Sequence, residues 1–466
     1  MDKHSRGFTV LLAGLGVLPP LSIDMGLPAL AVIASTFRSS DPAAAMTLSL
    51  FLLGFAVAPL FCGPISDRVG RRPVLLFGCA AFALAAAGCT FAPSIEILLA
   101  CRLIQGLGSG AATVLSTAIV RDLFEGHEAQ GRLAQIGVMR SFAPMIAPTL
   151  GAYILTVANW RCIYGLHTVL GIALWTLIML GFTESAKLNK TPLTVSALIS
   201  EYFEVIRHRV SFGYAAMNAL YFGAIFTYVT NSPLLMMKHF GVSNQDFGYL
   251  FAGTAFGIMC GAAVNKKMSA KKLPAQVSLF AGLSIASTAV LMNVILTAIG
   301  WDQPLTLCSF VFLVTFSAGL LTPTTAHKCI EPLPRIAGVV SAVMACSQMV
   351  SGAIAGMIVS NIYDEKSSWA MTGLMMFYVF AAAATYLFVV RPAERAAAVT
   401  VTVAPKASAA SDAASKLDSG SEFDSESEFA AGSKLDSGSE LDAGSEFDAA
   451  SEFDAVSELE AETIST

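Results

Sequence analysis

The sequence predicts an all-α polytopic membrane protein with twelve transmembrane helices in two six-helix bundles, followed by a disordered acidic C-terminal tail. Three observations predict this class. Of the 466 residues, 55% are hydrophobic and only 13% are charged, whereas soluble domains have roughly 25% charged residues. Long apolar runs recur along the chain, and basic residues gather in alternate loops between them.

An apolar run of about 20 residues is long enough for a helix to cross a bilayer. Twelve such runs occur, at residues 8–33, 44–64, 74–92, 96–118, 132–157, 163–183, 211–233, 246–265, 276–299, 304–327, 336–361 and 368–390. We therefore expect an N-terminal six-helix bundle at 1–183, a central cytoplasmic loop at 184–210, a C-terminal six-helix bundle at 211–395 and a tail at 396–466.

Basic residues favour the loops on one side. Nineteen lie before the first span, in alternate loops and after the last span: Lys3, Arg6, Arg68, Arg71, Arg72, Arg121, Arg132, Lys187, Lys190, Arg207, Arg209, Lys266, Lys267, Lys271, Lys272, Lys328, Arg335, Arg391 and Arg395. The other loops hold only Arg38, Arg161, Lys238 and Lys366. By the positive-inside rule, we expect both termini in the cytoplasm and the protein in the cell inner membrane.

The first apolar run admits a second interpretation. Ala29-Leu30-Ala31 has the small-x-small form of a signal-peptide cleavage site. The run is too long for a signal-peptide core, however, and eleven further spans follow it. A first membrane span is therefore the preferred interpretation.

The two halves are weakly similar in sequence. The loop after span 2 reads "GPISDRVGRR" from Gly63, and the loop after span 8 reads "GAAVNKKMSA" from Gly261. In this register Asp67 aligns with Asn265. Such internal symmetry is typical of a transporter built from two repeats around a central site.

Asp24 is an ionisable residue inside the first span, which marks it as a functional candidate. Pro28 has no N–H, so the Asp24 carbonyl loses its helical partner. Pro19 and Pro20 remove the partners of two earlier carbonyls in the same way. We therefore expect a broken helix that places the carboxylate in a cavity, or else an aspartate that is satisfied by a neighbouring helix.

Arg102 is the expected partner of Asp24. At about 1.5 Å per residue, both side chains lie ~10 Å below the outer surface. An adjacent arginine would favour the ionised carboxylate, and its withdrawal would favour proton binding. Asp24 and Arg102 are therefore predicted to couple protons to transport. Polar residues continue from Arg102 along one helix face, where they either line a cavity or pack tightly: Gln105, Ser109, Thr113 and Ser116.

Arg140 lies inside the fifth span. We expect it to extend toward the cytoplasm, to line the cavity and attract an anionic group, or to serve as a second charge in the proton path. Pro144, Pro148 and Gly151 follow it at helical spacing. These three allow a bend or close packing.

The second half contributes polar and aromatic candidates. Asn218, Tyr221 and Asn231 in span 7, and Gln348 in span 11, are the further residues predicted for a substrate cavity. Packing against neighbouring helices or lipid is the alternative for the aromatic side chain. This distribution places proton handling in the first half and draws substrate contacts from both.

Four motifs resemble those of a known family. "GPISDRVGRRPVLLFG" (63–78) resembles the signature between spans 2 and 3 of the major facilitator superfamily, with matching positions Gly63, Asp67, Arg68, Gly70, Arg71 and Arg72. "RLIQGLGSGAA" (102–112) resembles its span-4 arginine motif, and "APTLGA" (147–152) its span-5 antiporter motif. "IDMGLPAL" (23–30) is similar to the D-M-Y-L-P-A signature of the Bcr/CflA-type drug:proton antiporters.

The resemblance covers residues 7–395 and implies proton-driven export of small molecules, often antibiotics, by alternating access. The span 2–3 motif would then gate the conformational change, with Asp67 contacting a helix terminus in one state; simple orientation of the chain is the alternative for Arg71 and Arg72. The sequence departs from the family pattern at Gly26, where the signature has tyrosine, and at Ala147 and Ala152, where it has glycine.

Several function classes find no support in the sequence. The nine cysteines form no CxxC or metal-ligand spacing, and no GxxxxGK[ST] motif for ATP is present. We expect no enzyme activity, no cofactor besides the proton as coupling ion, and no bound metal or nucleic acid. The expected partners are a small-molecule substrate, protons and membrane lipid, and the protein is expected to be monomeric.

The tail repeats with a period of six residues from Ser415, as in "SKLDSG" and "SEFDSE". From Val401 onward it has 16 acidic residues and 3 lysines. A six-residue period gives a helix no single apolar face, and the high charge favours disorder. A passive repeat is the simplest interpretation, with partner binding or proton buffering as alternatives.

The predicted function is therefore proton-coupled antiport that exports small, often hydrophobic molecules, as in multidrug efflux. One alternative is export of a natural metabolite such as a nucleoside. Another, from a different class, is a non-transporting membrane sensor that signals through the tail. Deleting residues 401–466 distinguishes a transporter from a sensor, because a transporter would retain flux and a sensor would lose its output.

Overall fold

The structure, a computed structural model, describes residues 5–186 and 195–396. Every regular element in these residues is a helix, and twelve of the helical segments are long and apolar enough to cross a membrane. The predicted all-α class with twelve spans is confirmed. The disorder predicted for residues 396–466 falls outside the described residues except at Ala396, which the structure places in the last helical segment.

The helices follow one another with short connections. The first half contains α1 (Arg6–Asp24), η1 (Leu27–Ala29), α2 (Leu30–Phe37), α3 (Asp41–Val69), α4 (Arg71–Thr90), α5 (Ile95–Leu123), α6 (Gly126–Val157) and α7 (Arg161–Gly181). The second half contains α9 (Arg209–Leu234), η2 (Leu235–His239), α10 (Asn244–Ala270), α11 (Ala275–Ala298), α12 (Pro304–Ile330), η3 (Pro334–Ile336), α13 (Ala337–Ile362), α14 (Trp369–Thr385) and η4 (Tyr386–Val390). Between the halves lies α8 (Val195–Arg207), within the segment predicted as a loop.

Consecutive spans are antiparallel, so their ends gather at two faces of the protein. One face, which we call the terminal face, is formed by residues 5–8, 67–72, 121–128, 195–209, 266–275, 328–337 and 391–396. The other, which we call the opposite face, is formed by residues 37–41, 90–95, 157–161, 239–244, 298–304 and 362–369. Ion pairs support this division, because Arg71 reaches Asp122 at the terminal face, and Lys238 joins Asp41 at the opposite face.

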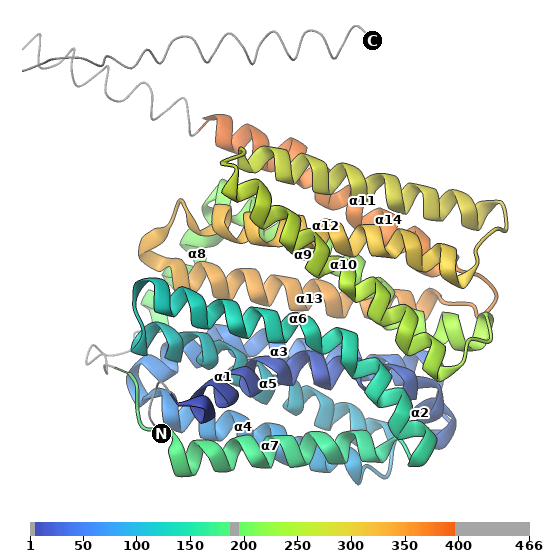
Figure 1. Cartoon of the computed structure of the whole chain (residues 1–466), viewed down its shortest axis with the longest axis horizontal. Coiled ribbons are helices and arrows are strands. Elements are labelled where there is room, and N and C mark those ends of the chain that lie inside the picture. Colours follow the sequence, from blue (N-terminus) through green and yellow to red (C-terminus); the bar gives the residue numbers. More distant parts are fainter. Residues whose placement is uncertain (1–4, 187–194, 397–466) are drawn as a thin grey trace, which may run out of the picture. The chain divides into compact units, whose positions relative to one another are not determined.

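Each half forms its own bundle. In the first, α5 packs against α3 and α4, α4 against α7, and α1 against α6; in the second, α10 and α11 pack against α12, and α13 and α14 against α9. The two bundles meet along α3 and α13 and along α6 and α10. Figure 1 shows α13 lying beside α3 at this boundary.

Glycines allow the second and fourth spans of each half to cross closely. A Cβ on Gly106 in α5 would lie 2.0 Å from the Phe51 carbonyl oxygen in α3. In the second half, a Cβ on Gly261 in α10 would lie 1.8 Å from the Phe316 carbonyl oxygen in α12. Real atoms do not approach so closely, so both crossings require glycine. The predicted similarity of the halves thus extends to their packing.

The start of α4 is held by a carboxylate that the sequence did not indicate. Glu184, just after α7, accepts hydrogen bonds from the backbone N–H groups of Arg71 at 2.8 Å and Arg72 at 3.0 Å. Gly70 has φ +108°, and a Cβ there would lie 2.4 Å from Glu184 Oε2. The glycine of the span 2–3 motif is therefore needed both for its backbone conformation and for the space that Glu184 occupies.

The same contacts determine how Glu184 titrates. Partial burial alone would raise the pKa of Glu184, but the backbone N–H groups of Ala186, Arg71, Arg72 and Ser185 outweigh this effect and hold the pKa below its usual value. The folded protein therefore favours the ionised carboxylate. This stabilisation is present above the ordinary glutamate pKa of about 4.3 and is lost as the pH falls through the lower folded-state value.

We predict that Gly106→Ala destabilises the protein by about 1–3 kcal/mol, the usual cost of overpacking. The matched control is Gly137→Ala in α6, where an added Cβ meets no atom within 4 Å; it should be neutral or stabilise by up to about 1 kcal/mol. Thermal unfolding in detergent measures both. Equal unfolding temperatures for the two variants would show that the α3–α5 crossing does not need glycine.

We predict that Glu184→Gln destabilises the protein at pH 7 by about 1 kcal/mol, the usual cost of losing a helix cap. The difference from the wild type should shrink as the pH falls below about 4.3, where the unfolded chain begins to bind the proton, and should vanish below the lower pKa of the folded protein. Thermal unfolding at pH 7 and at about pH 3 measures this, with exposed Glu125→Gln as the control. A difference of the same size at both pH values would contradict the capping role.

Candidate functional site

The first span is broken beside Asp24. The helix α1 ends at this residue, and Leu27–Ala29 form one 3₁₀ turn before α2 begins. The missing N–H of Pro28 explains why the helix stops here. Pro19 and Pro20 add no second break: α1 continues through both, so their effect is limited to the expected loss of two backbone hydrogen bonds.

Gly151 in α6 holds the broken segment in place. A Cβ at this position would lie 2.1 Å from the Met25 carbonyl oxygen. The helix α6 runs without interruption through Pro144 and Pro148. A bend and close packing were the two roles predicted for Pro144, Pro148 and Gly151. Gly151 serves close packing, because it contacts Met25, the residue after Asp24.

The Asp24 side chain is buried, with 5% of its surface exposed. It makes no hydrogen bond or ion pair with any residue that the structure describes. An ionised carboxylate in such surroundings costs free energy unless a cation or hydrogen-bond donors stabilise it. Binding a proton removes that cost, so this position suits a group that exchanges a proton.

Arg102 is also buried but is bound elsewhere. Its Nε donates to the Thr47 carbonyl oxygen at 3.1 Å, and its Nη1 donates to Gln105 Oε1 at 2.8 Å. The guanidinium carbon lies 4.5 Å from the Phe51 ring centroid and 5.6 Å from that of Tyr164, within the range of cation–π attraction. The structure does not bring Arg102 and Asp24 together; their pairing stays a prediction for another state of the protein.

His167 in α7 is a candidate that the sequence reasoning missed. It is 1% exposed, its ring centroid lies 5.9 Å from that of Tyr164, and neither ring nitrogen has a hydrogen-bond partner among the described residues. It is an ionisable residue inside an apolar span. The rule that identified Asp24 would therefore have identified it too.

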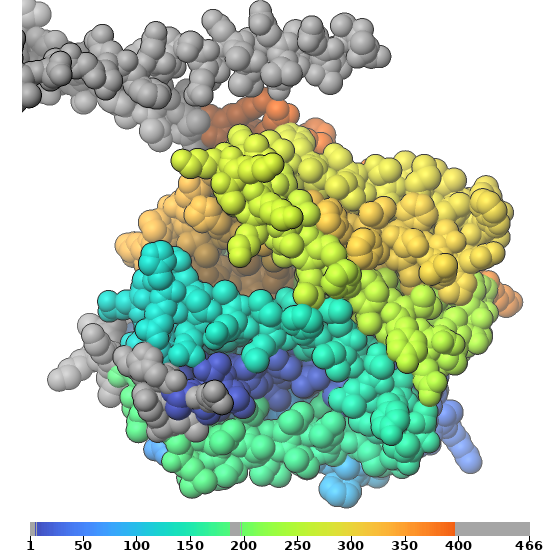
Figure 2. All heavy atoms as spheres, viewed as in Figure 1, coloured from blue at the N-terminus to red at the C-terminus, as the bar shows by residue number. Residues whose placement is uncertain are grey.

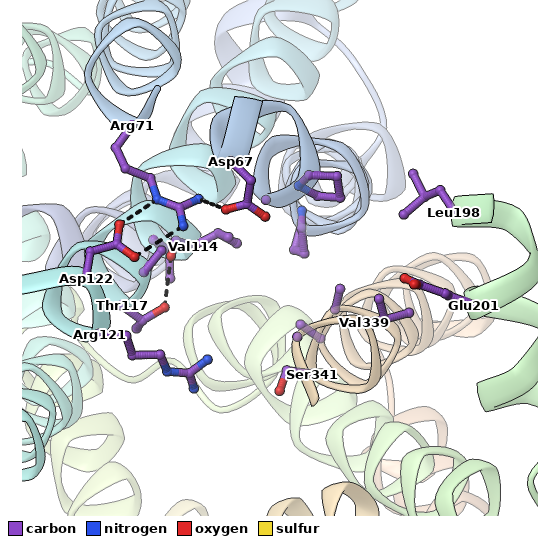
Figure 3. Close-up of a pocket in the computed structure, with 18 of the residues that line it drawn as sticks. Asp67, Arg71, Val114, Thr117, Arg121, Asp122, Leu198, Glu201, Val339 and Ser341 are labelled. Carbon is purple, nitrogen blue, oxygen red and sulfur yellow. Dashed lines mark hydrogen bonds and ion pairs between the residues drawn. The ribbon is translucent and has the colours of Figure 1, made fainter. Parts of the chain in front are cut away.

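A cavity of about 770 Å³ lies between the bundles and opens at the terminal face. Its walls come from α3, α5, α6, α8 and α13. Figure 2 shows the surface hollowed between α6 and α13, and Figure 3 shows side chains of α5, α8 and α13 around the space. Of the residues predicted for a substrate cavity, Thr113 and Arg140 line it.

The other predicted cavity residues lie elsewhere. Gln105, Ser109 and Asn231 are buried, and Gln105 Nε2, Ser109 Oγ and both polar atoms of the Asn231 amide have no partner among the described residues. Tyr221 donates to the Val314 carbonyl oxygen at 2.7 Å. Asn218 is buried and Gln348 is partly exposed, and neither lines this cavity.

The span 2–3 motif forms a network at the cavity mouth. Arg71 pairs with Asp67 and, through Nε at 2.9 Å, with Asp122 at the end of α5. Gly63, Asp67 and Arg68 line the cavity, whereas Arg72 donates to the Met179 carbonyl oxygen at 2.8 Å. The ion pairs of Arg71 thus join α3, α4 and α5 of the first half.

A linker helix crosses the boundary between the bundles. Tyr202 in α8 donates its hydroxyl to the Leu60 carbonyl oxygen in α3 at 2.7 Å. This carbonyl is available because Pro64, four residues later, has no N–H. Glu204 in the same helix pairs with Arg335, near the start of α13.

The bundles are closed at the opposite face. The broken segment η1 packs against α9 and α10, and both α2 and α3 pack against α9. Ile23, Leu27 and Leu30 share one buried apolar cluster with Tyr228 and Phe251 of the second half, which we call the apolar seal. Outside the seal, Lys238 pairs with Asp41 of the first half and, at 3.2 Å, with Glu365.

The described residues contain no group of three or more His, Cys, Asp or Glu side chains that could hold a metal ion. What the site offers is a buried acid at a helix break, a cavity open at one face, and closure at the other face.

Comparison with known proteins identifies the family. The pattern of the Major Facilitator Superfamily matches residues 12–356. An uncharacterized MFS-type transporter of Bacillus subtilis, YdgK, is 30% identical over 80% of this chain and 92% of its own. A bicyclomycin resistance protein homolog of Haemophilus influenzae is 27% identical over 79% of this chain and 92% of its own. The multidrug resistance protein MdtL of Escherichia coli is 31% identical over 53% of this chain and 63% of its own.

Solved structures agree with this assignment at the level of the fold. The D-xylose–proton symporter superimposes with a TM-score of 0.61 at 16% identity, over 82% of this chain and 97% of that one. A bacterial homolog of the human lysosomal transporter Spinster gives 0.63 at 14% identity, over 85% and 98%. The chain therefore belongs to the Major Facilitator Superfamily, as an integral multi-pass membrane transporter that resembles the Bcr/CflA-type drug antiporters.

Proposed function

We propose that the protein exports small molecules from the cell in exchange for protons, by alternating access. The observation that carries this proposal is Asp24, a buried carboxylate without a partner at the break in the first span. The relatives named for bicyclomycin resistance and multidrug resistance support drugs as cargo. The coupling ion is the proton, and the arrangement calls for no cofactor.

The charge distribution supports export as the direction of transport. The terminal face carries most of the basic loop residues, so it lies on the cytoplasmic side of the inner membrane, and both termini are on that side. The cavity opens at this face. In this state the protein would accept cargo from the cytoplasm, and export requires the cavity to close there and open at the opposite face.

The two closures at the opposite face differ in strength. Each Å² of buried apolar surface contributes roughly 25 cal/mol, whereas an ion pair near the surface contributes about 0–1 kcal/mol. The apolar seal is therefore the main barrier to opening, and the Asp41–Lys238 pair adjusts it. Asp24 adjoins the seal, so opening the seal would expose its carboxylate to water and to protons.

Proton exchange at Asp24 would couple to this movement. When the segment around Asp24 separates from α9 and α10, the carboxylate gains water and can ionise at lower cost. A rearrangement that brings Arg102 to Asp24 would stabilise the ionised form further. A proton on Asp24 would then favour the state with the seal closed. Antiport further requires that bound cargo favour the state in which Asp24 is ionised, as a cavity that closes around its cargo would do.

We predict that Asp24→Asn reduces pH-gradient-driven transport at least tenfold, because the amide cannot exchange a proton. Proteoliposomes with an imposed pH gradient would be tested with bicyclomycin, nalidixate and ethidium, a panel that spans neutral, anionic and cationic drugs. Asp364→Asn, an exposed carboxylate on the opposite face, is the control and should retain flux. If Asp24→Asn retained gradient-driven flux of a compound that the wild type moves, Asp24 would not be the coupling residue.

We predict that Lys238→Gln shifts the protein toward opening at the opposite face, because the mostly buried Asp41 carboxylate loses its cation. Hydrogen–deuterium exchange should increase severalfold at the start of α3 and the end of α9, and decrease beside the cavity in α8 and α13. Lys366→Gln removes the same charge from an exposed position on this face and should change neither. An unchanged exchange pattern in Lys238→Gln would show that the ion pair does not hold this face closed.

A further inference from the structure

The arginines that line the cavity are not equally engaged. Arg71 is held between Asp67 and Asp122, so its positive charge is fully offset and this group keeps a net charge of −1. In contrast, Arg121 and Arg140 make no hydrogen bond or ion pair with any residue that the structure describes. Figure 3 shows the Arg121 side chain extending into the cavity without a dashed contact, beside the paired Arg71 and Asp122.

The charges are also separated by depth. Three carboxylates line the cavity. Asp67 lies two residues before the end of α3, Asp122 one residue before the end of α5, and Glu201 on α8, so all three belong to the terminal face, at the mouth. Arg140 lies fourteen residues into α6, ~21 Å along the helix at 1.5 Å per residue. Thr113, ten residues before the end of α5, lies at a similar depth in the facing wall, ~15 Å from the mouth.

No carboxylate among the described residues pairs with Arg140, and the three carboxylates of the cavity wall lie toward the mouth. The remaining wall of the cavity consists mainly of small or apolar side chains, including Pro59, Val114, Val339 and Ala342. A cation in a concave, low-dielectric wall raises the local concentration of anions. A guanidinium in particular offers two parallel N–H donors, which match a carboxylate, sulfonate or phosphate group.

We propose that the deep end of the cavity binds an anionic group of the cargo through Arg140, and that Arg121 attracts this group at the mouth. The cargo class is thus a small amphiphilic anion, whose apolar part lies against Val114, Val339 and Ala342. This inference rests on the proposed export function, because it treats the cavity as the place where cargo enters.

The test compares two dyes with one ring scaffold and opposite charge. Binding of fluorescein, an anion at pH 7.5, and of rhodamine 123, a cation, would be measured by fluorescence anisotropy with the purified full chain in detergent. The wild type should bind fluorescein at least tenfold more tightly than rhodamine 123. Equal or reversed affinities would overturn the proposal.

Variants then assign the effect to its residues. Arg140→Gln should weaken fluorescein binding at least tenfold without weakening rhodamine 123 binding. Arg140→Lys should weaken fluorescein binding less than Arg140→Gln does, and Arg121→Gln should weaken it two- to fivefold. Arg209→Gln, which replaces an arginine outside the cavity at the same face, should not weaken it. Thermal unfolding shows whether each variant is folded, and Arg140→Lys and Arg121→Gln carry the test if Arg140→Gln is not. Equal weakening of both dyes by the folded Arg140 variants would overturn the proposal.

A lipid headgroup offers the same chemistry as an anionic cargo. Fluorescein binding would therefore be repeated in nanodiscs of phosphatidylcholine with and without phosphatidylglycerol. Unchanged affinity supports a cargo site. If phosphatidylglycerol displaced fluorescein through Arg140, the subsite would belong to lipid, and the cargo proposal would be overturned.

Transport in proteoliposomes separates this inference from the function on which it rests. Gradient-driven flux of fluorescein that Arg140→Gln reduces supports both. If ethidium or bicyclomycin moved but fluorescein neither bound nor moved, the anion proposal would fail and the export function would stand. If fluorescein bound through Arg140 but no compound moved, the export function would fail, and with it the identification of the bound anion as cargo.

Discussion

The burial of one carboxylate at a helix break constrains the rest of this structure. Asp24 ends α1, and the chain needs a turn before α2 because Pro28 cannot continue the hydrogen-bond ladder. Exposed backbone of this kind is not tolerated in lipid, so other helices must cover it. Gly151 provides the space on one side, and α9 and α10 of the second half cover the other. The covering of Asp24 therefore depends on how the two bundles lie together.

That dependence makes the boundary between the bundles asymmetric. At the opposite face, apolar side chains of both halves form one cluster around the break. At the terminal face, the same boundary contains a cavity of about 770 Å³ with arginines in its wall. Separating the sealed end exposes apolar surface, at roughly 25 cal/mol per Å². This free energy has to be offset by contacts that form elsewhere, by cargo or by protons, and this requirement links the cavity to Asp24.

Much of the fold was predictable from the sequence, because span length and charge position are local properties. The break at Pro28 and the candidate status of Asp24 followed from single residues. The partner of Arg102 did not, since depth along two helices fixes a level but not a direction, and the guanidinium instead reaches Thr47 and Gln105. Glu184 was missed because its role depends on the distant start of α4. Arg140 was identified as a candidate, but its lack of a partner became visible only when the helices around it were in place.

We propose that protonation of Asp24 and cargo binding oppose each other because they favour different arrangements of the two bundles. The most direct measurement is proton release from purified protein in weakly buffered detergent solution when a bound compound of the drug panel is added. We expect proton release in the wild type that saturates together with binding, and no release in Asp24→Asn although the compound still binds. Binding without proton release in the wild type, or equal release in the variant, would contradict this proposal.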